Sequence, residues 1–256
     1  MINEEKNLIN NHKVHMISYG NEKFIKSKKR IFNEAINSKF FYSIQIYEPE
    51  DLNKEFKCKF KDILKQNRGG GYWLWKLDII NQKLNKIDDN DYLIYLDSGC
   101  TINKNGLNRL IQYISLLEES KYGIISFKLI HQERIWTIKE IFEYCNLKMD
   151  SKEALDGQYI GTVLIMKKNQ HLKNLINNWE NIINNNALLI TDNFNKKQDS
   201  FFKDNRHDQS LLSILRKIHG SIILNDETYF GKYNKENYEN NENSLKYPFW
   251  ASRIKE

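Results

Sequence analysis

The sequence predicts an α/β fold in which a mostly parallel sheet is covered by helices on both faces. Apolar runs of strand length alternate along the chain with longer segments that carry apolar residues at helical spacing. This alternation favours a parallel sheet, because parallel neighbours need crossover connections. The clearest single strand is Tyr92–Leu96, an apolar run that ends abruptly in Asp97, as buried strands of parallel sheets do.

Each expected strand has its own pattern. Val14–Tyr19 is apolar and ends at Gly20, whereas residues 41–47 alternate apolar and polar side chains, as a half-buried strand does. Further apolar runs place the remaining strands at 123–129, 159–166 and 221–224.

Each expected helix follows from its apolar spacing or from charge on one face. Residues 49–67 place lysines on the outer face, and 172–184 place Trp179 on the apolar side. The other helices are expected at 20–37, 77–87, 106–119, 135–145 and 210–219. Because no repeat or linker is found, we expect a flexible leader at 1–12 and a single domain at 13–256.

Composition and charge narrow the class of partner. The chain has 39 basic and 33 acidic residues, a net charge of +6 that is spread along the sequence. A nucleic-acid-binding protein usually shows a sharper basic stripe, so we expect no nucleic-acid partner and favour a small anionic ligand or an anionic surface.

Cysteine usage and hydropathy indicate the compartment. Cys58, Cys100 and Cys145 are far apart and odd in number, which argues against a disulfide framework or a paired zinc site. The first residues lack the apolar core of a signal peptide, and no stretch reaches the ~18 apolar residues of a membrane span. We therefore expect a cytoplasmic protein without a transmembrane segment, and peripheral membrane contact stays open.

The end of the strand Tyr92–Leu96 is the first candidate site. Ligands of open α/β sheets bind beyond the carboxyl ends of the strands. Asp97 stands there, followed by Ser98 and Gly99, which are too small to block a ligand. Asp97 could hold a metal–diphosphate or a ribose, or it could cap a turn.

The second candidate is the glycine run at 69–71, with Arg68 before it and Lys76 after it. Consecutive glycines allow close approach of a ligand and expose N–H groups that suit phosphate oxygens. Tyr72 and Trp75 could stack on a sugar or a base, or they could pack in the core.

The third candidate is Arg-His-Asp-Gln at 206–209, at the start of an expected helix. Helix N-termini favour anions. His207 could bind a metal or a phosphate, and Asp208 could act as a base. The alternative is that Asp208 only caps the helix.

Two weaker candidates lie outside these motifs. Gln158 stands between glycines and could contact a sugar hydroxyl or belong to a turn, and Asp156 nearby is a second candidate base for an acceptor. Arg253, near the end of the chain, could cover a diphosphate or lie on the surface.

Three motifs occur together: Gly-Gly-Tyr-Trp-Leu-Trp-Lys at 70–76, Tyr-Leu-Asp-Ser-Gly-Cys at 95–100 and Arg-His-Asp-Gln-Ser at 206–210. As a set they resemble a family of nucleotide-sugar glycosyltransferases with the GT-A fold, found in bacterial capsule loci and large DNA viruses. The resemblance covers most of the chain. It implies a GT-A-like (Rossmann-like) domain, located in the cytoplasm of a bacterium or of a virus-infected host cell.

The resemblance also implies roles for single residues. Tyr19 and Gly20 would lie against the base or ribose of a nucleoside diphosphate sugar, and Lys76 would stand near its sugar or diphosphate. Asp97 would be the leading acid of a DxD motif, but Gly99 replaces the second acid.

Two ways of neutralising the leaving diphosphate stay open. A divalent cation, Mn²⁺ or Mg²⁺, could bind Asp97, with His207 completing its ligands. Alternatively, Lys76 and Arg253 could do this without a metal.

The expected reaction is sugar transfer to a hydroxyl of a glycan or small-molecule acceptor. Asp208 is the preferred base, and Gln209 would act instead in a retaining enzyme. The alternatives are a nucleotide-sugar-binding protein or a sugar-nucleotide hydrolase. An RNA-associated protein is disfavoured, because the aromatic and basic residues gather at strand ends.

Overall fold

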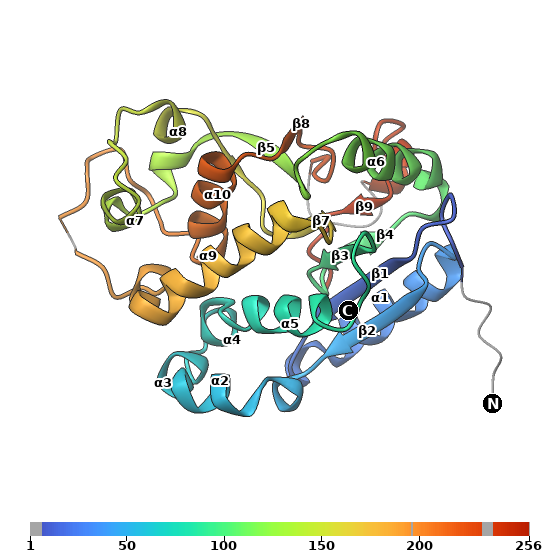
Figure 1. The fold of residues 1–256 in the computed structure, drawn as a ribbon, viewed down its shortest axis with the longest axis horizontal. Coiled ribbons are helices and arrows are strands. Elements are labelled where there is room, and N and C mark those ends of the chain that lie inside the picture. The colour runs from blue at the N-terminus through green and yellow to red at the C-terminus, as the bar shows by residue number, and fades with distance from the viewer. Residues whose placement is uncertain (1–6, 196, 232–237, 256) are drawn as a thin grey trace.

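A seven-stranded sheet forms the centre of the protein, which is described by a computed structural model over residues 7–195, 197–231 and 238–255 (Figure 1). The strand order is β2-β1-β3-β7-β5-β6, and β8 also pairs with β5. The strands are β1 (Val14–Tyr19), β2 (Ser43–Tyr47), β3 (Tyr92–Leu96), β5 (Ile124–Gln132), β6 (Gly157–Tyr159), β7 (Val163–Lys167) and β8 (Ile222–Asn225). A second, two-stranded sheet pairs β4 (Thr101–Ile102) with β9 (Phe249–Trp250).

The sheet is mostly parallel, as expected. β1 is parallel to β2 and β3, and β5 is parallel to β8. β7 runs antiparallel to both β3 and β5, so β3 and β5 point the same way. Only β6 and β7, among the strands of this sheet that the structure describes, run in the opposite direction.

Helices cover both faces of the sheet. Alternate residues of β3 separate two cores: Leu93 and Tyr95 face one, and Ile94 and Leu96 face the other. α5 (Trp75–Leu84), α9 (Gln170–Asn186) and α10 (Asp208–His219) cover the first, with Trp179 1% exposed as expected. α1 (Ile25–Ser38) and α6 (Leu107–Glu119) cover the second.

Two expected elements are wrong in their extent. The strand expected at 159–166 is split by Ile160, Gly161 and Thr162 into β6 and β7. The helix expected at 49–67 consists of short pieces, a 3₁₀ turn at Pro49–Asp51, α2 (Lys54–Lys59) and α3 (Lys61–Leu64). The other short helices are α4 (Gly69–Tyr72), α7 (Lys139–Tyr144) and α8 (Lys152–Leu155).

The N-terminal part of the chain packs against the second core. Residues 1–6 of the expected leader lie outside the described residues. Ile9, in the remaining part, is 6% exposed and packs into the second core.

None of the described helices has the length and apolar character that a membrane crossing requires.

Candidate active site

The polar side chains of the candidate site gather at the edge of the sheet where β1 and β3 end. These strands are parallel, so their carboxyl ends meet at the edge where α/β proteins bind ligands. Asp97 follows β3, and its backbone N–H donates to Thr162 O at 3.0 Å. Because β7 is antiparallel to β3, its first residue Val163 pairs with Leu96, and the β6–β7 connection reaches the same edge.

Three charged side chains meet at this edge, and we call Lys76, Asp97 and Asp208 the edge triad. Lys76 Nζ lies 2.5 Å from Asp208 Oδ2 and 3.8 Å from Asp97 Oδ1. The side chains of Lys76 and Asp208 are 3% and 5% exposed, whereas that of Asp97 is 31% exposed. Asp97 is therefore the member that a ligand meets first, and the other two stand behind it.

The pKa values of Lys76 and Asp208 are both shifted by burial and by the neighbouring charges. Burial alone would lower the pKa of Lys76, but the carboxylates of Asp208 and Asp97 outweigh burial and raise it. Burial raises the pKa of Asp208 to about 6; Lys76 opposes this shift and the charge of Asp97 adds to it. The edge thus holds a firmly protonated lysine beside a carboxyl group that titrates near neutral pH.

A tyrosine supports the outer carboxylate. The Tyr95 hydroxyl donates to Asp97 Oδ1. Burial, followed by the charge of Asp97, raises the pKa of Tyr95 well above its usual range, so the hydroxyl keeps its proton and stays a donor.

Gly161 joins the edge triad to Gln209. Its carbonyl accepts from Lys76 Nζ at 3.0 Å, and its N–H donates to Gln209 Oε1 at 2.8 Å. A Cβ at this position would lie 3.1 Å from Gln209 Cβ. The buried Arg216 holds the preceding chain by donating to Ile160 O at 2.8 Å. Gly161 was not among the predicted site residues, although a glycine inside an apolar run signals close backbone approach.

The glycine run forms a tight left-handed turn. Residues 69–73 all have positive φ, between 55° and 97°. A Cβ on Gly71 would lie 2.7 Å from Leu64 Cα, so only glycine fits there. The N–H groups of Gly70 and Gly71 donate to carbonyls of the preceding turn at 3.2 and 2.8 Å. The expectation that they face a phosphate is wrong, and the turn instead positions Lys76 at the start of α5.

Two aromatic residues expected near the donor pack against each other. The rings of Tyr19 and Trp75 stack with their centroids 3.8 Å apart, and the residues are 8% and 5% exposed. Trp75 Nε1 donates to Gly69 O at 2.9 Å. Gly20 follows β1, where a Cβ would lie 3.0 Å from Lys28 Cγ. A donor contact of these residues stays a prediction.

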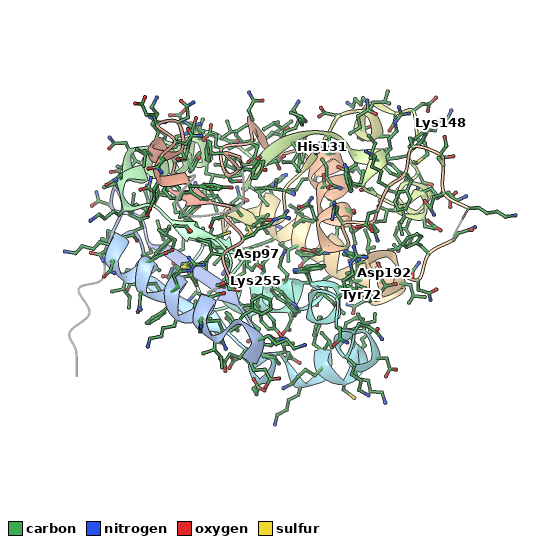
Figure 2. All side chains as sticks on the ribbon, turned by 180° about the vertical axis from the view of Figure 1, so that it is seen from behind. Tyr72, Asp97, His131, Lys148, Asp192 and Lys255 are labelled. Carbon is green, nitrogen blue, oxygen red and sulfur yellow. The ribbon has the colours of Figure 1, made fainter. Side chains whose placement is uncertain are left out.

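A second polar group, which we call the rim cluster, consists of Arg68, Tyr72, Asp192, Asp204 and His207. Tyr72 and Asp192 are labelled in Figure 2. His207 Nε2 lies 2.9 Å from Asp192 Oδ1, and its ring stacks on Tyr72 at 5.2 Å. Arg68 donates to Asp192 at 3.0 Å and to Asp204 at 2.7 Å. Burial lowers the pKa of His207 although Asp192 opposes this. Neither aspartate was predicted from the sequence, because no pattern marks them in the polar stretch 191–205.

The end of the chain, residues 249–255, passes beside Asp97, and we call it the C-terminal arm. The Ile254 N–H donates to Gly99 O at 2.9 Å. A Cβ on Gly99 would lie 3.2 Å from Arg253 Cα. A larger side chain at position 99 would press on the C-terminal arm.

The C-terminal arm carries two basic residues, Arg253 and Lys255. The Arg253 backbone itself packs on Gly99, two residues after Asp97, and Lys255 is labelled in Figure 2. Ser98, expected to face the donor, is 6% exposed, and its carbonyl accepts from Arg30 at 3.0 Å.

The expected metal ligands do not come together as a metal site. Asp97 Oδ1 accepts from Tyr95 and faces Lys76, and His207 Nε2 is bound to Asp192. Across residues 7–195, 197–231 and 238–255, no group of three or more His, Cys, Asp or Glu side chains could hold an ion. Asp97 and His207 are thus engaged by other side chains, and a cation held by Asp97 together with the phosphate oxygens of a donor stays a prediction.

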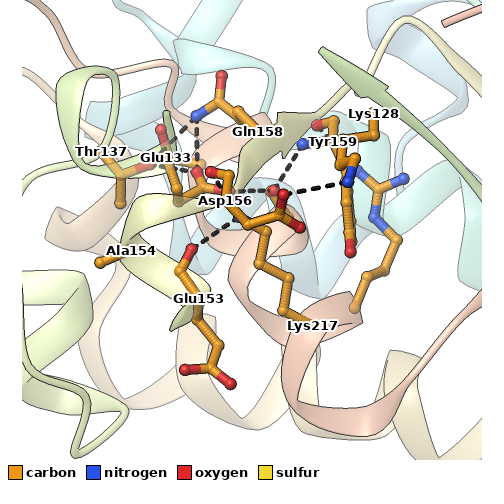
Figure 3. A network of polar contacts seen from close by, with 12 residues as sticks. Lys128, Glu133, Thr137, Glu153, Ala154, Asp156, Gln158, Tyr159 and Lys217 are labelled. Carbon is orange, nitrogen blue, oxygen red and sulfur yellow. Dashed lines mark hydrogen bonds and ion pairs between the residues drawn. The ribbon is translucent and has the colours of Figure 1, made fainter. Parts of the chain in front are cut away.

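The two residues expected to contact an acceptor lie elsewhere (Figure 3). Asp156 precedes β6, whose other end leads to Gly161, and it pairs with Lys128 at 3.1 Å; its contact with an acceptor stays a prediction. Gln158 is 1% exposed, and its amide bonds to other side chains. Gln158 was predicted to contact a sugar hydroxyl or to belong to a turn, and β6 turns its side chain into the interior.

No protein-family model matches the sequence, and no curated protein matches it. Solved structures do match the fold. The apo structure of WbbM, a bifunctional glycosyltransferase, matches with a TM-score of 0.50 and 14% identity over 95% of this chain and 46% of that chain. A glycosyltransferase involved in the glycosylation of the major capsid of PBCV-1 gives 0.46 and 12% over 93% of both chains. Mouse xyloside xylosyltransferase 1 gives 0.47 and 9% over 85% and 86%.

At these identities the likeness concerns the fold alone. The α/β architecture with a mostly parallel sheet and helices on both faces, expected to be GT-A-like, is confirmed. The edge that carries Asp97 is the edge where such sheets bind ligands.

Proposed function

We propose that the protein is a glycosyltransferase that moves a sugar from a nucleoside diphosphate sugar to an acceptor hydroxyl. The edge triad is the observation that carries the proposal. A buried lysine between two carboxylates, one of them open to solvent, stands at the ligand-binding edge of a GT-A-like sheet. The fold match to WbbM, a bifunctional glycosyltransferase, supports this assignment.

In the proposed reaction, the bond between the anomeric carbon and the diphosphate breaks and a bond to the acceptor oxygen forms. Negative charge develops on the leaving diphosphate, and fixed cations stabilise it. We assign this task to Lys76, with Arg253 of the C-terminal arm, whose backbone packs on Gly99, as a second cation. The donor's hydroxyl groups would meet Asp97.

The acceptor hydroxyl loses a proton as it attacks, and we assign that proton to Asp208. A general base works best when its pKa lies near the working pH, and burial raises the pKa of Asp208 to about 6. The Lys76 ammonium stabilises the carboxylate until transfer occurs. Gln209, next in the chain, would contact the sugar from the Gly161 side.

A second function, nucleotide-sugar binding without transfer, is favoured by one observation: glycine stands in place of the second acid. The two proposals differ in the fate of the bound donor. A binder is stabilised by the nucleotide sugar but releases no nucleoside diphosphate, whereas a transferase releases it when an acceptor is present. A hydrolase, the remaining alternative, releases it without an acceptor.

The decisive test is a thermal-shift panel of UDP-, GDP-, CDP- and dTDP-sugars, each with Mn²⁺ and with EDTA, followed by transfer assays with the donor that binds. Asp97→Ala is expected to weaken donor binding and to abolish transfer. Asp88→Ala, which removes an exposed carboxylate paired with Lys13, is the matched control and should behave as wild type. Full transfer by Asp97→Ala would exclude the assignment.

A further inference from the structure

A chain of buried hydrogen bonds leads from Glu133 to Gln209. Glu133 lies in a 3₁₀ turn after β5 and is fully buried. Its Oε1 accepts from Gln158 Nε2 at 2.8 Å, and Gln158 Oε1 accepts from Gln209 Nε2 at 2.6 Å. Gln209 Oε1 then accepts from the Gly161 N–H at 2.8 Å. Figure 3 shows Glu133 and Gln158 at the interior end of this chain.

The direction of every bond in the chain is fixed at Glu133. Its partners are all donors, namely the hydroxyls of Thr137 and Ser213, the Lys217 ammonium at 3.0 Å and the Gln158 amide. A carboxylate only accepts hydrogen bonds. Gln158 must therefore turn its NH₂ group toward Glu133 and its carbonyl toward Gln209.

The same constraint passes to the next amide. Because Gln158 offers a carbonyl, Gln209 must turn its NH₂ group toward it and its own carbonyl toward the Gly161 N–H. The reversed arrangement would place a Gln209 N–H against the Gly161 N–H, and the Gln158 carbonyl against the Glu133 carboxylate. The first contact would join two donors and the second two acceptors, so neither could form a hydrogen bond. In a buried setting such unmade hydrogen bonds are costly.

We propose that Glu133 is a positioning residue, which acts through Gln158 to set the orientation of the Gln209 carboxamide in the active site. The inference rests on the proposed function, since it names what prepares Gln209 for the donor sugar. With its carbonyl held by Gly161 and one N–H held by Gln158, Gln209 offers the sugar a second N–H in a fixed direction. Preorganised donors of this kind are what active sites require.

The first test compares two variants that each remove one hydrogen bond to Glu133. Gln158→Met breaks the chain at its middle. Ser213→Ala removes a donor to the other Glu133 oxygen and the acceptor of the Tyr159 N–H, and it keeps every side chain of the chain to Gln209. We expect Gln158→Met to lower kcat about ten- to a hundredfold, as misplacement of an active-site group does, with the donor KM nearly unchanged. Ser213→Ala should keep kcat within about twofold.

A double-mutant cycle separates positioning from a loss of packing. If Gln158 acts through Gln209, Gln158→Met should lower kcat no further in a Gln209→Ala background. An equal loss of kcat in both backgrounds would overturn the proposal, as would a loss in Ser213→Ala that matches the one in Gln158→Met.

A measurement without turnover keeps the inference apart from the proposed function. The resonance of the Gln209 side-chain N–H that bonds to Gln158, assigned by its loss in Gln209→Ala, should exchange slowly with solvent in wild type and fast in Gln158→Met. It should stay slow in Ser213→Ala. Fast exchange in wild type would overturn the chain of bonds itself. Slow exchange in a protein that transfers no sugar would retain the positioning and reject only the proposed function.

Discussion

The edge triad and the rim cluster are built from the same kinds of charge but differ in their access to water. In the edge triad, the Lys76 side chain is 3% exposed, and in the rim cluster the Arg68 side chain is 40% exposed. Burying an ion pair costs desolvation energy that the pair only partly recovers, whereas an exposed pair costs little and contributes little. Stability alone therefore does not account for a buried lysine between two carboxylates, and we attribute the edge triad to chemistry. We attribute the rim cluster to structure, because it holds the polar stretch 191–205 against Arg68.

Removing the lysine of the edge triad should have the largest effect. Lys76→Met leaves Asp97 and Asp208 facing each other without their shared cation, so we expect a loss of about 3–5 kcal/mol in the free energy of unfolding and no detectable transfer. Urea unfolding at pH 7 measures the first and the transfer assay the second.

The control for this variant is Lys13→Met, which breaks an exposed lysine–aspartate pair of similar length. It should change the free energy of unfolding very little, because exposed ion pairs contribute little to stability. Equal losses in the two variants would show that burial does not distinguish the edge triad.

Titration should distinguish the two regions by the sign of their pH dependence. The folded pKa of Asp208 is raised to about 6 from 3.8, so between pH 4 and 6 the folded state binds more protons than the unfolded state. The free energy of unfolding then falls as pH rises through this window, by up to about 3 kcal/mol. In the rim cluster, burial would raise the pKa of Asp192, but His207 and Arg68 outweigh it and lower that pKa. Its contribution is lost only as pH falls below about 4.

The same group should shape activity. If the Asp208 carboxylate accepts the acceptor's proton, kcat should fall about tenfold per pH unit below pH 6. Unfolding curves from pH 4 to 8, for wild type and Asp208→Asn, check the predicted pH dependence of the free energy of unfolding. The substitution should remove the part of this dependence that comes from Asp208. A kcat that is flat from pH 5 to 8 would remove Asp208 from the role of base.

The sequence predicted the position of residues that depends on where a single strand ends. The prediction failed where contacts with residues distant in the sequence determine the path of the chain. Asp97 was found because Tyr92–Leu96 is apolar throughout and parallel strands bring their ends to one edge. The strand expected at 159–166 failed because Gly161 redirects the chain. Arg216, more than fifty residues away, holds that turn by its bond to the Ile160 carbonyl. The apolar periodicity of a short segment cannot predict a bond to a residue so far away in the sequence.

Burial of polar side chains was the least predictable property. Gln158 was predicted to contact a sugar hydroxyl or to belong to a turn, yet its partner Glu133 lies 25 residues away and draws it inward. Asp192 and Asp204 were not singled out, since only the fold brings Arg68 to them. Sequence patterns report faces and ends of elements, whereas a hydrogen-bond network depends on which elements meet.

The smallest effect is expected in the rim cluster. Asp204→Asn removes one of the two carboxylates that Arg68 contacts and leaves the bond to Asp192 in place. Because the Asp204 side chain is 32% exposed, we expect a change of less than about 1 kcal/mol in the free energy of unfolding, and a kcat within about twofold of wild type. Asp97→Asn, measured beside it by the same urea unfolding and transfer assays, should keep a similar stability but lose transfer. A loss of transfer in Asp204→Asn as large as that in Asp97→Asn would assign catalysis to the rim cluster, because the two substitutions remove the same charge from two carboxylates of nearly equal exposure.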